Sequence, residues 1–254
     1  MSEFTELTHQ SAMARIRLTP WDERSLRIRT AEIIEASGPE SDLPGLWNLI
    51  DEWIKQHGVE YSFGRISADA MLTKQSVQGQ GYHFVETSLL MSRLRTEEWP
   101  RTPASLSLQL SPACDQDMEE LRAIAINDFH HGRFLEDPSI DPVQARARTG
   151  SWLTDLCARG NLHAVQMHKK SIGFVAHTIG EDGCADLILY GVSSNFPMLA
   201  LPLWVSGLKS LNEAGATRYR AMISAANVHV VNLYLKLGFS VTSVHYGFSK
   251  WHTQ

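Results

Sequence analysis

The chain contains the segment Ile223-Ser-Ala-Ala-Asn-Val-His-Val-Val-Asn-Leu-Tyr-Leu-Lys-Leu-Gly-Phe239, which predicts the end of a strand, a helix and the start of another strand. Asn227 has a side chain that often caps a helix N-terminus. The helix is expected over Val228–Leu237, with Gly238 in the position typical of a C-cap. Tyr234 follows Asn227 by seven residues, about two helical turns, so we expect both side chains on one face.

Outward from this segment, helices and strands predict a mixed α/β domain with the order ααβββαβαβ. The turns at residues 169–171 and 180–183 are short enough for antiparallel hairpins. The expected elements are a helix beginning at Asp115 or Asp117, a helix over Val143–Arg159, strands over Leu162–His168, Ile172–Ile179 and Ala185–Val192, a helix over Pro202–Ala214, and strands over Tyr219–Ile223 and Val241–Phe248.

The first part of the chain predicts a smaller βαβαβ unit. Its expected elements are a strand over Leu26–Ile34, a helix over Leu46–Gln56, a strand over Tyr61–Ile66, a short helix to Val77 with Asp69 as N-cap, and a strand over Tyr82–Met91. Residues 97–114 are rich in Pro and Ser, which is typical of a linker, although Leu106–Leu110 also fits an edge strand. We therefore expect an N-terminal half at 1–96, a linker at 97–114 and a C-terminal domain at 115–254.

Composition excludes several classes of protein. The 254 residues carry a net charge of -5 and no run of like charges, whereas a nucleic-acid-binding protein is usually basic. No apolar stretch approaches the roughly 18 residues that span a bilayer, and residues 1–18 lack the apolar core of a signal peptide. Three widely spaced cysteines fit reduced thiols. We expect a cytoplasmic protein with no nucleic-acid or membrane partner.

The segment 223–239 resembles the closing motif of the GNAT acetyltransferases. In that family an Asn after the strand opens a helix, an Asn-Leu-Tyr triplet follows, and Leu-Gly-Phe ends it, as at residues 227, 232–234 and 237–239 here. The resemblance covers about Asp115–Lys250. It implies a fold of the α/β (α+β) class, a GNAT fold with a mixed central sheet, preceded here by the smaller, incomplete GNAT-like βαβαβ half.

A narrower resemblance is to the two-part acetyltransferases that acetylate nucleotide-linked amino sugars, the TDP-fucosamine N-acetyltransferase-like enzymes. Three short segments carry it: Trp21-Asp22-Glu23, Gly81–Thr87 and Phe129–Phe134. This resemblance implies a small-molecule amine as the acceptor and acetyl-CoA, or another acyl-CoA, as the cosubstrate. It is compatible with a homodimer.

The family resemblance also implies roles for particular residues. Tyr234 would protonate the departing thiolate, and backbone N–H groups at Gly191 and Val192 would polarise the thioester carbonyl. For Asn227 two roles stay open: it is a helix cap only, or it also contacts CoA. For Tyr234 the alternative to a proton donor is a tyrosine that only packs in the core. The residues expected to contact CoA are Gly191, Val192, Ser193, Asn195, Asn227 and Tyr234.

The expected pyrophosphate loop departs from the family pattern Arg/Gln-x-x-Gly-x-Gly/Ala. It reads Val192-Ser-Ser-Asn-Phe-Pro-Met-Leu-Ala-Leu-Pro-Leu-Trp204, without glycine or a basic residue and with two prolines that lack N–H donors. The departure leaves three alternatives open: weak binding of CoA, an acyl donor on a carrier protein, and a non-catalytic GNAT-like binding module.

Candidates for the catalytic base lie near the third strand of the second half, because acyl transfer requires a proton acceptor for the amine. They are Asp186 and His177, and a chain of water molecules is the alternative. An anionic acceptor with a ring would suit Arg and aromatic side chains. The residues expected to bind the acceptor are His130, His131, Arg133, Phe134 and Tyr190.

Other chemistries lack their motifs. The adjacent His130 and His131 point in different directions and no HExxH sequence is present, so we expect no metal. Gly-x-Ser-x-Gly and Gly-x-Gly-x-x-Gly are also absent, which argues against a serine hydrolase and a nicotinamide enzyme. The leading hypothesis is therefore an N-acyltransferase.

Overall fold

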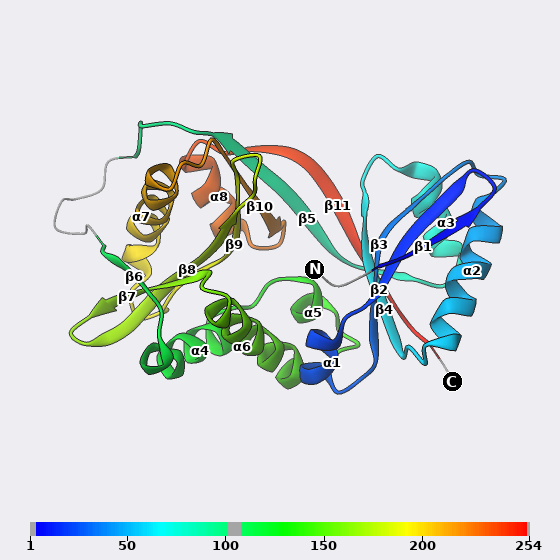
Figure 1. Ribbon diagram of the computed structural model, residues 1–254, viewed down its shortest axis with the longest axis horizontal. Coiled ribbons are helices and arrows are strands. Elements are labelled where there is room, and N and C mark those ends of the chain that lie inside the picture. Colours follow the sequence, from blue (N-terminus) through cyan, green and yellow to red (C-terminus); the bar gives the residue numbers. More distant parts are fainter. Residues whose placement is uncertain (1–3, 101–107, 253–254) are drawn as a thin grey trace.

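The computed structural model describes residues 4–100 and 108–252, and the strands of these residues form one mixed sheet (Figure 1). The order across the sheet is β1-β2-β3-β4-β11-β5-β10-β9-β8-β7-β6. Two neighbouring pairs, β3–β4 and β9–β10, are parallel, and the others are antiparallel. The strands are β1 (Thr5–His9), β2 (Ala12–Leu18), β3 (Thr30–Ser37), β4 (Tyr61–Ser67), β5 (His83–Leu94), β6 (Leu110–Pro112), β7 (Leu162–Met167), β8 (Lys170–Ile179), β9 (Cys184–Val192), β10 (Arg218–Ser224) and β11 (Ser240–Trp251).

Helices cover both faces of this sheet. They are α1 (Pro20–Leu26), α2 (Leu43–Gln56), α3 (Met71–Gly79), α4 (Met118–Asn127), α5 (Arg133–Glu136), α6 (Pro142–Ala158), α7 (Ala200–Glu213) and α8 (Val228–Lys236), with 3₁₀ turns η2 (Asp115–Asp117) and η3 (Pro197–Leu199). In the second half of the chain α4 and α6 pack on one face, and α7 and α8 pack on the other. In the first half α2 and α3 pack on one face, and α1 and α5 lie on the other.

The expected order of elements is confirmed in both halves. Apart from the short helix α5, which forms between α4 and α6 where a loop was expected, the succession α4, α6, β7, β8, β9, α7, β10, α8, β11 is the ααβββαβαβ order. The elements β3, α2, β4, α3 and β5 are the βαβαβ unit. The turns after β7 and β8 join antiparallel neighbours, as expected. The helix at α2 buries Leu46, Ile50, Trp53 and Ile54 on one stripe, because apolar residues recur there with helical spacing.

Two features at the start of the chain differ from the expectation. A hairpin of β1 and β2 precedes the βαβαβ unit and buries Ala12, Ala14 and Ile16 on alternate positions. Leu26 ends helix α1 instead of beginning a strand. Thr19 and Pro20 open α1, and proline suits this place because the first helical N–H has no partner inside the helix.

Smaller corrections concern caps and loops. Asp69 does not cap α3; the N-cap residue is Ala70, and the Asp69 carboxylate accepts a hydrogen bond from Ser67. Helix α7 begins at Ala200, before Pro202, because η3 leads into it. The expected linker contains residues 101–107, which lie outside the described residues, as do the first two residues of the candidate edge strand Leu106–Leu110. The edge strand that the structure describes is β6.

Strand β11 joins the two halves of the molecule. It pairs with β4 on one side and with β5 on the other, and in Figure 1 β5 and β11 cross from one half to the other. A small cluster of Leu26, Tyr61, Phe63, Phe134, Ile140 and Ala145 packs between β4 and the helices α1, α5 and α6. The boundaries expected at 96 and 115 stay a prediction.

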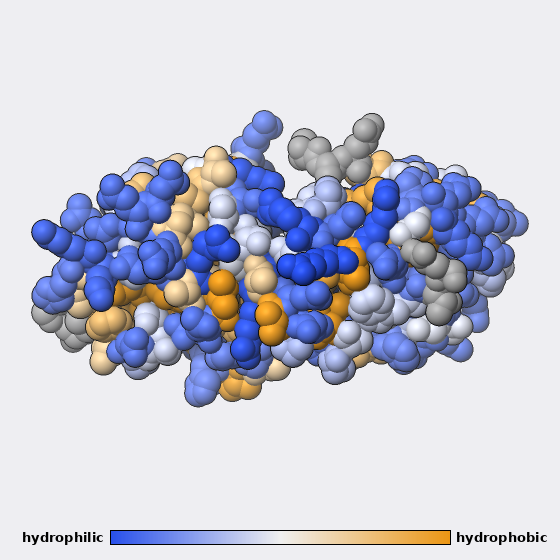
Figure 2. Space-filling view, turned by 90° about the horizontal axis from the view of Figure 1, so that it is seen from below, coloured by the Kyte–Doolittle hydropathy of each residue, from blue (hydrophilic) through white to orange (hydrophobic). Residues whose placement is uncertain are grey.

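The face seen from below is mostly hydrophilic, with a few hydrophobic side chains near its middle (Figure 2). Among the helices within residues 4–100 and 108–252, none has the length and apolar character needed to cross a membrane.

Candidate active site

Strands β9 and β10 separate along their length and leave a cavity between them. Their parallel pairing ends at Asp186 and Arg220. Just beyond this point Ile188 has no partner on β8 where the register shifts, and such a bulge bends a strand and increases its twist. Residues 187–192 and 221–224 then line a cavity of about 1470 Å³. Backbone groups on the separated edges therefore face this space without a partner strand, and a bound molecule can use them.

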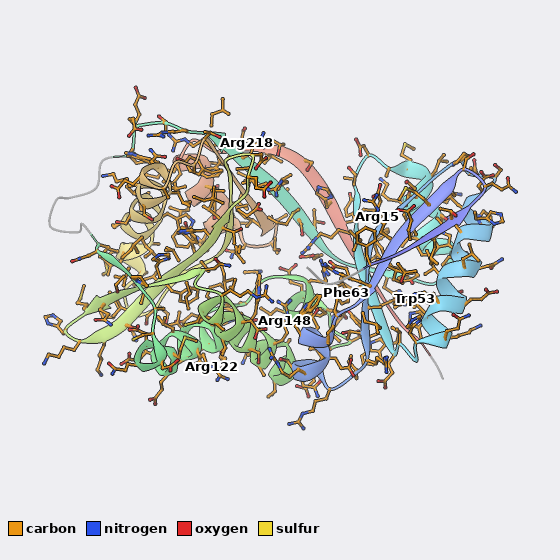
Figure 3. The ribbon with its side chains drawn as sticks, viewed as in Figure 1. Arg15, Trp53, Phe63, Arg122, Arg148 and Arg218 are labelled. Atoms are coloured by element: carbon orange, nitrogen blue, oxygen red, sulfur yellow. The ribbon has the colours of Figure 1, made fainter. Side chains whose placement is uncertain are left out.

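Both halves of the chain line this cavity. Helix α8 contributes Asn227 and Tyr234, and Trp204 comes from α7. The loop and helix at residues 128–135 and part of α6 form another wall. Phe63 of β4 and Arg148 of α6, which also line it, lie at the centre of the molecule (Figure 3). A ligand in the cavity would contact residues that are far apart in sequence.

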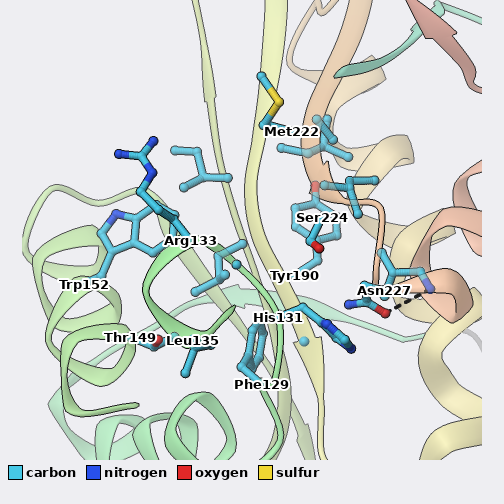
Figure 4. Close-up of a pocket in the computed structure, with 18 of the residues that line it drawn as sticks. Phe129, His131, Arg133, Leu135, Thr149, Trp152, Tyr190, Met222, Ser224 and Asn227 are labelled. Atoms are coloured by element: carbon cyan, nitrogen blue, oxygen red, sulfur yellow. Dashed lines mark hydrogen bonds between the residues drawn. The ribbon is translucent and has the colours of Figure 1, made fainter. Parts of the chain in front are cut away.

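Asn227 is the N-cap of α8, as expected. Its Oδ1 accepts a hydrogen bond from the Val230 amide at 3.3 Å (Figure 4). Its Nδ2 has no hydrogen-bond partner within the described parts of the chain, and the residue lines the cavity. Capping therefore uses the oxygen and leaves the side-chain N–H groups for a ligand.

Tyr234 is both a core residue and a wall of the cavity. It is 3% exposed, its ring packs edge-on against Phe239 at 4.9 Å between centroids, and the Trp204 ring stands perpendicular to it at 6.3 Å. Burial raises the pKa of Tyr234, and the Trp204 indole acts in the opposite direction. The Trp204 Nε1 is buried and makes no hydrogen bond of normal geometry to a described residue. The Tyr234 hydroxyl therefore stays protonated at neutral pH and carries a proton at the cavity wall.

Three amides of the loop expected to bind pyrophosphate are already hydrogen-bonded to other groups of the protein. The Ser194 amide donates to Asp128 Oδ2 at 3.0 Å, the Asn195 amide to Ser193 Oγ at 3.3 Å, and the Phe196 amide to the Ser193 carbonyl at 2.8 Å. Val192 lines the cavity, whereas Ser193 and Asn195 do not. A carboxylate at such a loop opposes a second anion there.

Asp186 lines the cavity, but its charge is balanced. Both of its carboxylate oxygens accept hydrogen bonds from Arg220, and the Nη2–Oδ2 distance is 2.9 Å. The pair is about half exposed, and the hydrogen bond to Asp186 raises the pKa of Arg220. Both carboxylate oxygens are already hydrogen-bonded to the guanidinium, so the geometry gives little support to Asp186 as the base.

His177 does not line the cavity. Its Nδ1 lies 3.1 Å from the Tyr190 hydroxyl, and its ring stacks on His163 at 5.3 Å between centroids. Burial, with a smaller contribution from His163, lowers the pKa of His177 to about 4. Tyr190 lines the cavity but is only 7% exposed, and its hydroxyl contacts His177. The structure therefore does not bring His177 to the place where an amine would bind.

The loop residues expected to bind the acceptor all line the cavity, although not in equivalent ways. His130 and His131 are exposed, whereas Phe134 is buried in the cluster between the two halves. Arg133 is largely buried over the Phe63 ring, 4.4 Å from its centroid. Figure 4 shows His131 extending from its loop into the cavity, in the direction of Asn227.

Charged residues of the first half, together with Arg133 of the second, form a group that was not expected from the sequence. We call it the arginine–glutamate cluster: Arg17, Glu32, Arg65, Glu86 and Arg133, all of which line the cavity. Arg65 Nη2 lies 2.6 Å from Glu86 Oε1. Arg17 donates to Glu32 Oε2 through both Nη2 and Nε, and the Nε–Oε2 distance is 3.0 Å. Burial opposes the charge on Glu32, but Arg133 and Arg17 outweigh it and lower the Glu32 pKa. Three arginines face two glutamates, so the cluster carries one excess positive charge.

A second unexpected group lies where the loop at His131 meets the end of β10. Glu136 Oε1 accepts hydrogen bonds from Ser224 Oγ at 2.5 Å and from the Gly132 amide at 3.0 Å, and His131 Nδ1 lies 3.3 Å from the same oxygen. His131 and Ser224 line the cavity, and Glu136 lies behind them. Ser224 stands in the segment 223–239, but nothing in the sequence indicates that Glu136, 88 residues away, contacts it.

No group of three or more His, Cys, Asp or Glu side chains in the described ranges is arranged to hold a metal ion. The site therefore consists of a cavity between two separated strands, a buried tyrosine, a capping asparagine and the charged side chains of both halves.

Comparisons of the sequence with known proteins give a distant relative. No protein-family model matches the chain. A spore coat polysaccharide biosynthesis protein, SpsD from Bacillus subtilis, is 21% identical over 238 residues, which cover 91% of this chain and 81% of that protein.

Solved structures resemble the chain over almost its whole length. A GCN5-related N-acetyltransferase from Sphaerobacter thermophilus has a TM-score of 0.64 at 14% identity, covering 95% of this chain and 81% of that one. One from Kribbella flavida has a TM-score of 0.64 at 12% identity, covering 99% and 91%. A tandem GNAT protein from the clavulanic acid biosynthesis pathway has a TM-score of 0.62 at 12% identity, covering 96% and 80%. The chain has the GNAT fold.

Proposed function

We propose that this chain is an N-acyltransferase that transfers an acetyl group, or another acyl group, from acyl-CoA to the amine of a small molecule. One observation carries the proposal: the cavity that opens where β9 and β10 separate has Asn227 and Tyr234 on the same wall. An extended thioester arm can enter between the two strands and use their unpaired backbone groups. The GNAT fold of the chain supports this assignment.

The geometry suits direct attack of the amine on the thioester. The amine nitrogen forms a bond to the carbonyl carbon, and backbone N–H groups of β9 near Gly191 stabilise the negative oxygen. The C–S bond then breaks, and Tyr234 gives its proton to the departing thiolate. Asn227 Nδ2 is available to hold the thioester arm. Each of these groups lines the cavity.

For the acceptor, we propose a nucleotide-linked amino sugar. The similarity to a spore coat polysaccharide biosynthesis protein supports a sugar substrate. The excess positive charge of the arginine–glutamate cluster supports an anionic one. Trp21, Phe63 and Trp152 also line this side of the cavity and offer apolar surfaces for a ring.

The proposal is tested by incubating the full chain with acetyl-CoA and TDP-fucosamine and measuring release of free CoA and the mass of the product. We expect a product heavier than the acceptor by one acetyl group, formed in step with CoA. A panel of UDP-linked and TDP-linked amino sugars and of simple amines locates the preferred acceptor. CoA release without an acetylated amine, or no turnover with any of them, would contradict the proposal.

A second candidate function has its own supporting observation. The carboxylate of Asp128 holds the Ser194 amide at the expected pyrophosphate loop, which favours a donor without a nucleotide diphosphate, such as an acyl group on a carrier protein, or a non-catalytic ligand. Calorimetric titration with acetyl-CoA separates these alternatives from the first. Binding at micromolar concentrations supports acyl-CoA, whereas activity with an acylated carrier protein alone supports the carrier.

A further inference from the structure

The geometry favours neither of the two residues expected from the sequence as the general base. His177 lies outside the cavity, and Asp186 is bound by Arg220. The imidazole of His131, by contrast, lines the cavity and is about one third exposed. We propose, resting on the function proposed above, that His131 accepts the proton of the attacking amine and that Glu136 positions it.

The contact between Glu136 and His131 fixes which ring nitrogen can act as a base. His131 Nδ1 lies 3.3 Å from Glu136 Oε1. A carboxylate accepts a hydrogen bond and cannot donate one when ionised, so Nδ1 carries the hydrogen. In the neutral ring the lone pair is then on Nε2. The carboxylate also stabilises the imidazolium that forms when Nε2 takes up a proton.

Two further contacts hold the Glu136 carboxylate in place. The Gly132 amide donates to the same Oε1, which ties the carboxylate to the loop that carries His131. Ser224 Oγ also donates to it at 2.5 Å and accepts from the Ala226 amide at 3.1 Å, which ties it to the end of β10. The carboxylate is therefore anchored on both sides, and its side chain is only 16% exposed. An anchored acceptor orients the imidazole toward the cavity, as a base requires.

The positions of His131 and Glu136 suit the geometry of acyl transfer. Ser224 and Asn227 lie on the chain between β10 and α8, and Tyr234 follows on α8. In Figure 4 the His131 ring extends toward Asn227 from the opposite wall. His131 and Tyr234 thus lie on different walls of the cavity. One can take the proton of the amine while the other protonates the thiolate.

The proton balance is complete with the residues present. The neutral amine attacks the carbonyl carbon, the N–C bond forms, and the positive nitrogen loses one proton to His131 Nε2. The C–S bond breaks, and the thiolate takes one proton from Tyr234. The imidazolium then releases its proton to solvent and the tyrosinate regains one, which restores both residues.

A second pocket, lined by Glu136, Ala225 and Ala226, opens on the far side of the Glu136 carboxylate.

The test measures steady-state acetylation of TDP-fucosamine with acetyl-CoA by the full-length chain. We expect His131→Ala to lower kcat about 100-fold while KM for each substrate changes less than about threefold, since general bases contribute on the order of 100-fold or more. Added imidazole should restore at least a tenth of the lost rate. Glu136→Gln, which keeps the shape but weakens the orientation, should lower kcat about 10-fold, and Glu136→Asp should recover part of it.

His83→Ala is the matched control, because His83 is exposed on β5 and does not line the cavity. Its kcat should equal that of the wild type with and without imidazole. A His131→Ala enzyme whose kcat stays within about threefold of the wild type, or whose loss imidazole leaves unchanged, overturns the assignment. If the wild type acetylates no amine, the proposed function fails and the base assignment falls with it. If the wild type is active and His131→Ala is equally active, only the base assignment fails.

Discussion

Asp186 and Arg220 form the last pair on the parallel strands β9 and β10, and their side chains make a two-pronged ion pair at the point where the strands separate. The pair thus marks the floor of the cavity. Beyond it the bulge at Ile188 turns β9 away. The separation of the strands is a property of the backbone, and the ion pair only coincides with its beginning.

If the bulge separates the strands, the energetic coupling between Asp186 and Arg220 should be small. Both are about half exposed, and exposed ion pairs contribute at most about 1 kcal/mol. A double-mutant cycle of Asp186→Ala and Arg220→Ala, measured by urea unfolding, should give a coupling free energy below about 1 kcal/mol. A coupling of several kcal/mol would mean that the pair itself holds the strands at this point.

Tyr234→Phe should lower kcat about 100-fold with little change in the KM for acetyl-CoA, because the variant keeps the packing and loses the proton donor. Tyr219→Phe is the control: Tyr219 is also buried against Phe239, but it does not line the cavity and its hydroxyl makes no hydrogen bond to a described residue. Its kcat should match the wild type. Full activity of Tyr234→Phe would exclude the role of acid.

Asp128→Asn should tighten the binding of CoA about fivefold. The substitution removes a negative charge beside the Ser194 amide, and two charges about 4 Å apart in water repel each other by about 1 kcal/mol. Isothermal calorimetry with CoA measures the change, and Asp128→Glu, which keeps the charge, is the control. Equal affinities of Asp128→Asn and the wild type would mean that the diphosphate binds elsewhere.

The hydrogen bonds of Asp117 predict that the free energy of unfolding falls at acid pH. Burial favours the neutral carboxyl, but hydrogen bonds from Ser171 Oγ at 2.6 Å, the Cys114 amide at 2.9 Å and Gln166 at 2.7 Å outweigh it and lower the pKa of Asp117 to about 2. The ordinary pKa of aspartate is about 3.9. At pH values above about 4, this lowered pKa stabilises the folded chain by about 2 to 3 kcal/mol. The contribution is lost as the pH falls from about 4 to 2.

Asp117→Asn should therefore reduce the free energy of unfolding at pH 7 by about 2 to 3 kcal/mol. Its deficit relative to the wild type should shrink as the pH is lowered through 4 toward 2. Denaturant unfolding at several pH values measures this, with the exposed Asp115→Asn as a control. A deficit that is the same at every pH would show that the carboxylate charge has no part in it.

Periodicity and caps in the sequence predicted most of the fold. Asn227 and Gly238 bound α8 because their side-chain chemistry and backbone freedom act locally. The hairpin of β1 and β2 was missed because Ala12 and Ala14 form its buried face with very small side chains. The bulge at Ile188 was also not predicted, since it depends on how β8 and β9 align.

The sequence predicted best those parts of the site in which neighbouring residues share a role. Asn227 and Tyr234 lie on one helix, and helical spacing placed both on the cavity wall. The contact of Glu136 with Ser224 and the ion pairs of Glu32 with Arg17 and Arg133 join distant segments. Such pairs depend on the order of strands in the sheet, which hydrophobic periodicity does not encode.

The position of β11 between β4 and β5 has a consequence for how the chain is made. Of the strands described here, β11 is the last to leave the ribosome, yet it fills the central gap of the sheet. Until it emerges, β4 and β5 both present open edges, which are prone to pair with other chains. The nascent protein therefore completes its sheet only after β11 has left the ribosome and can pair with both strands.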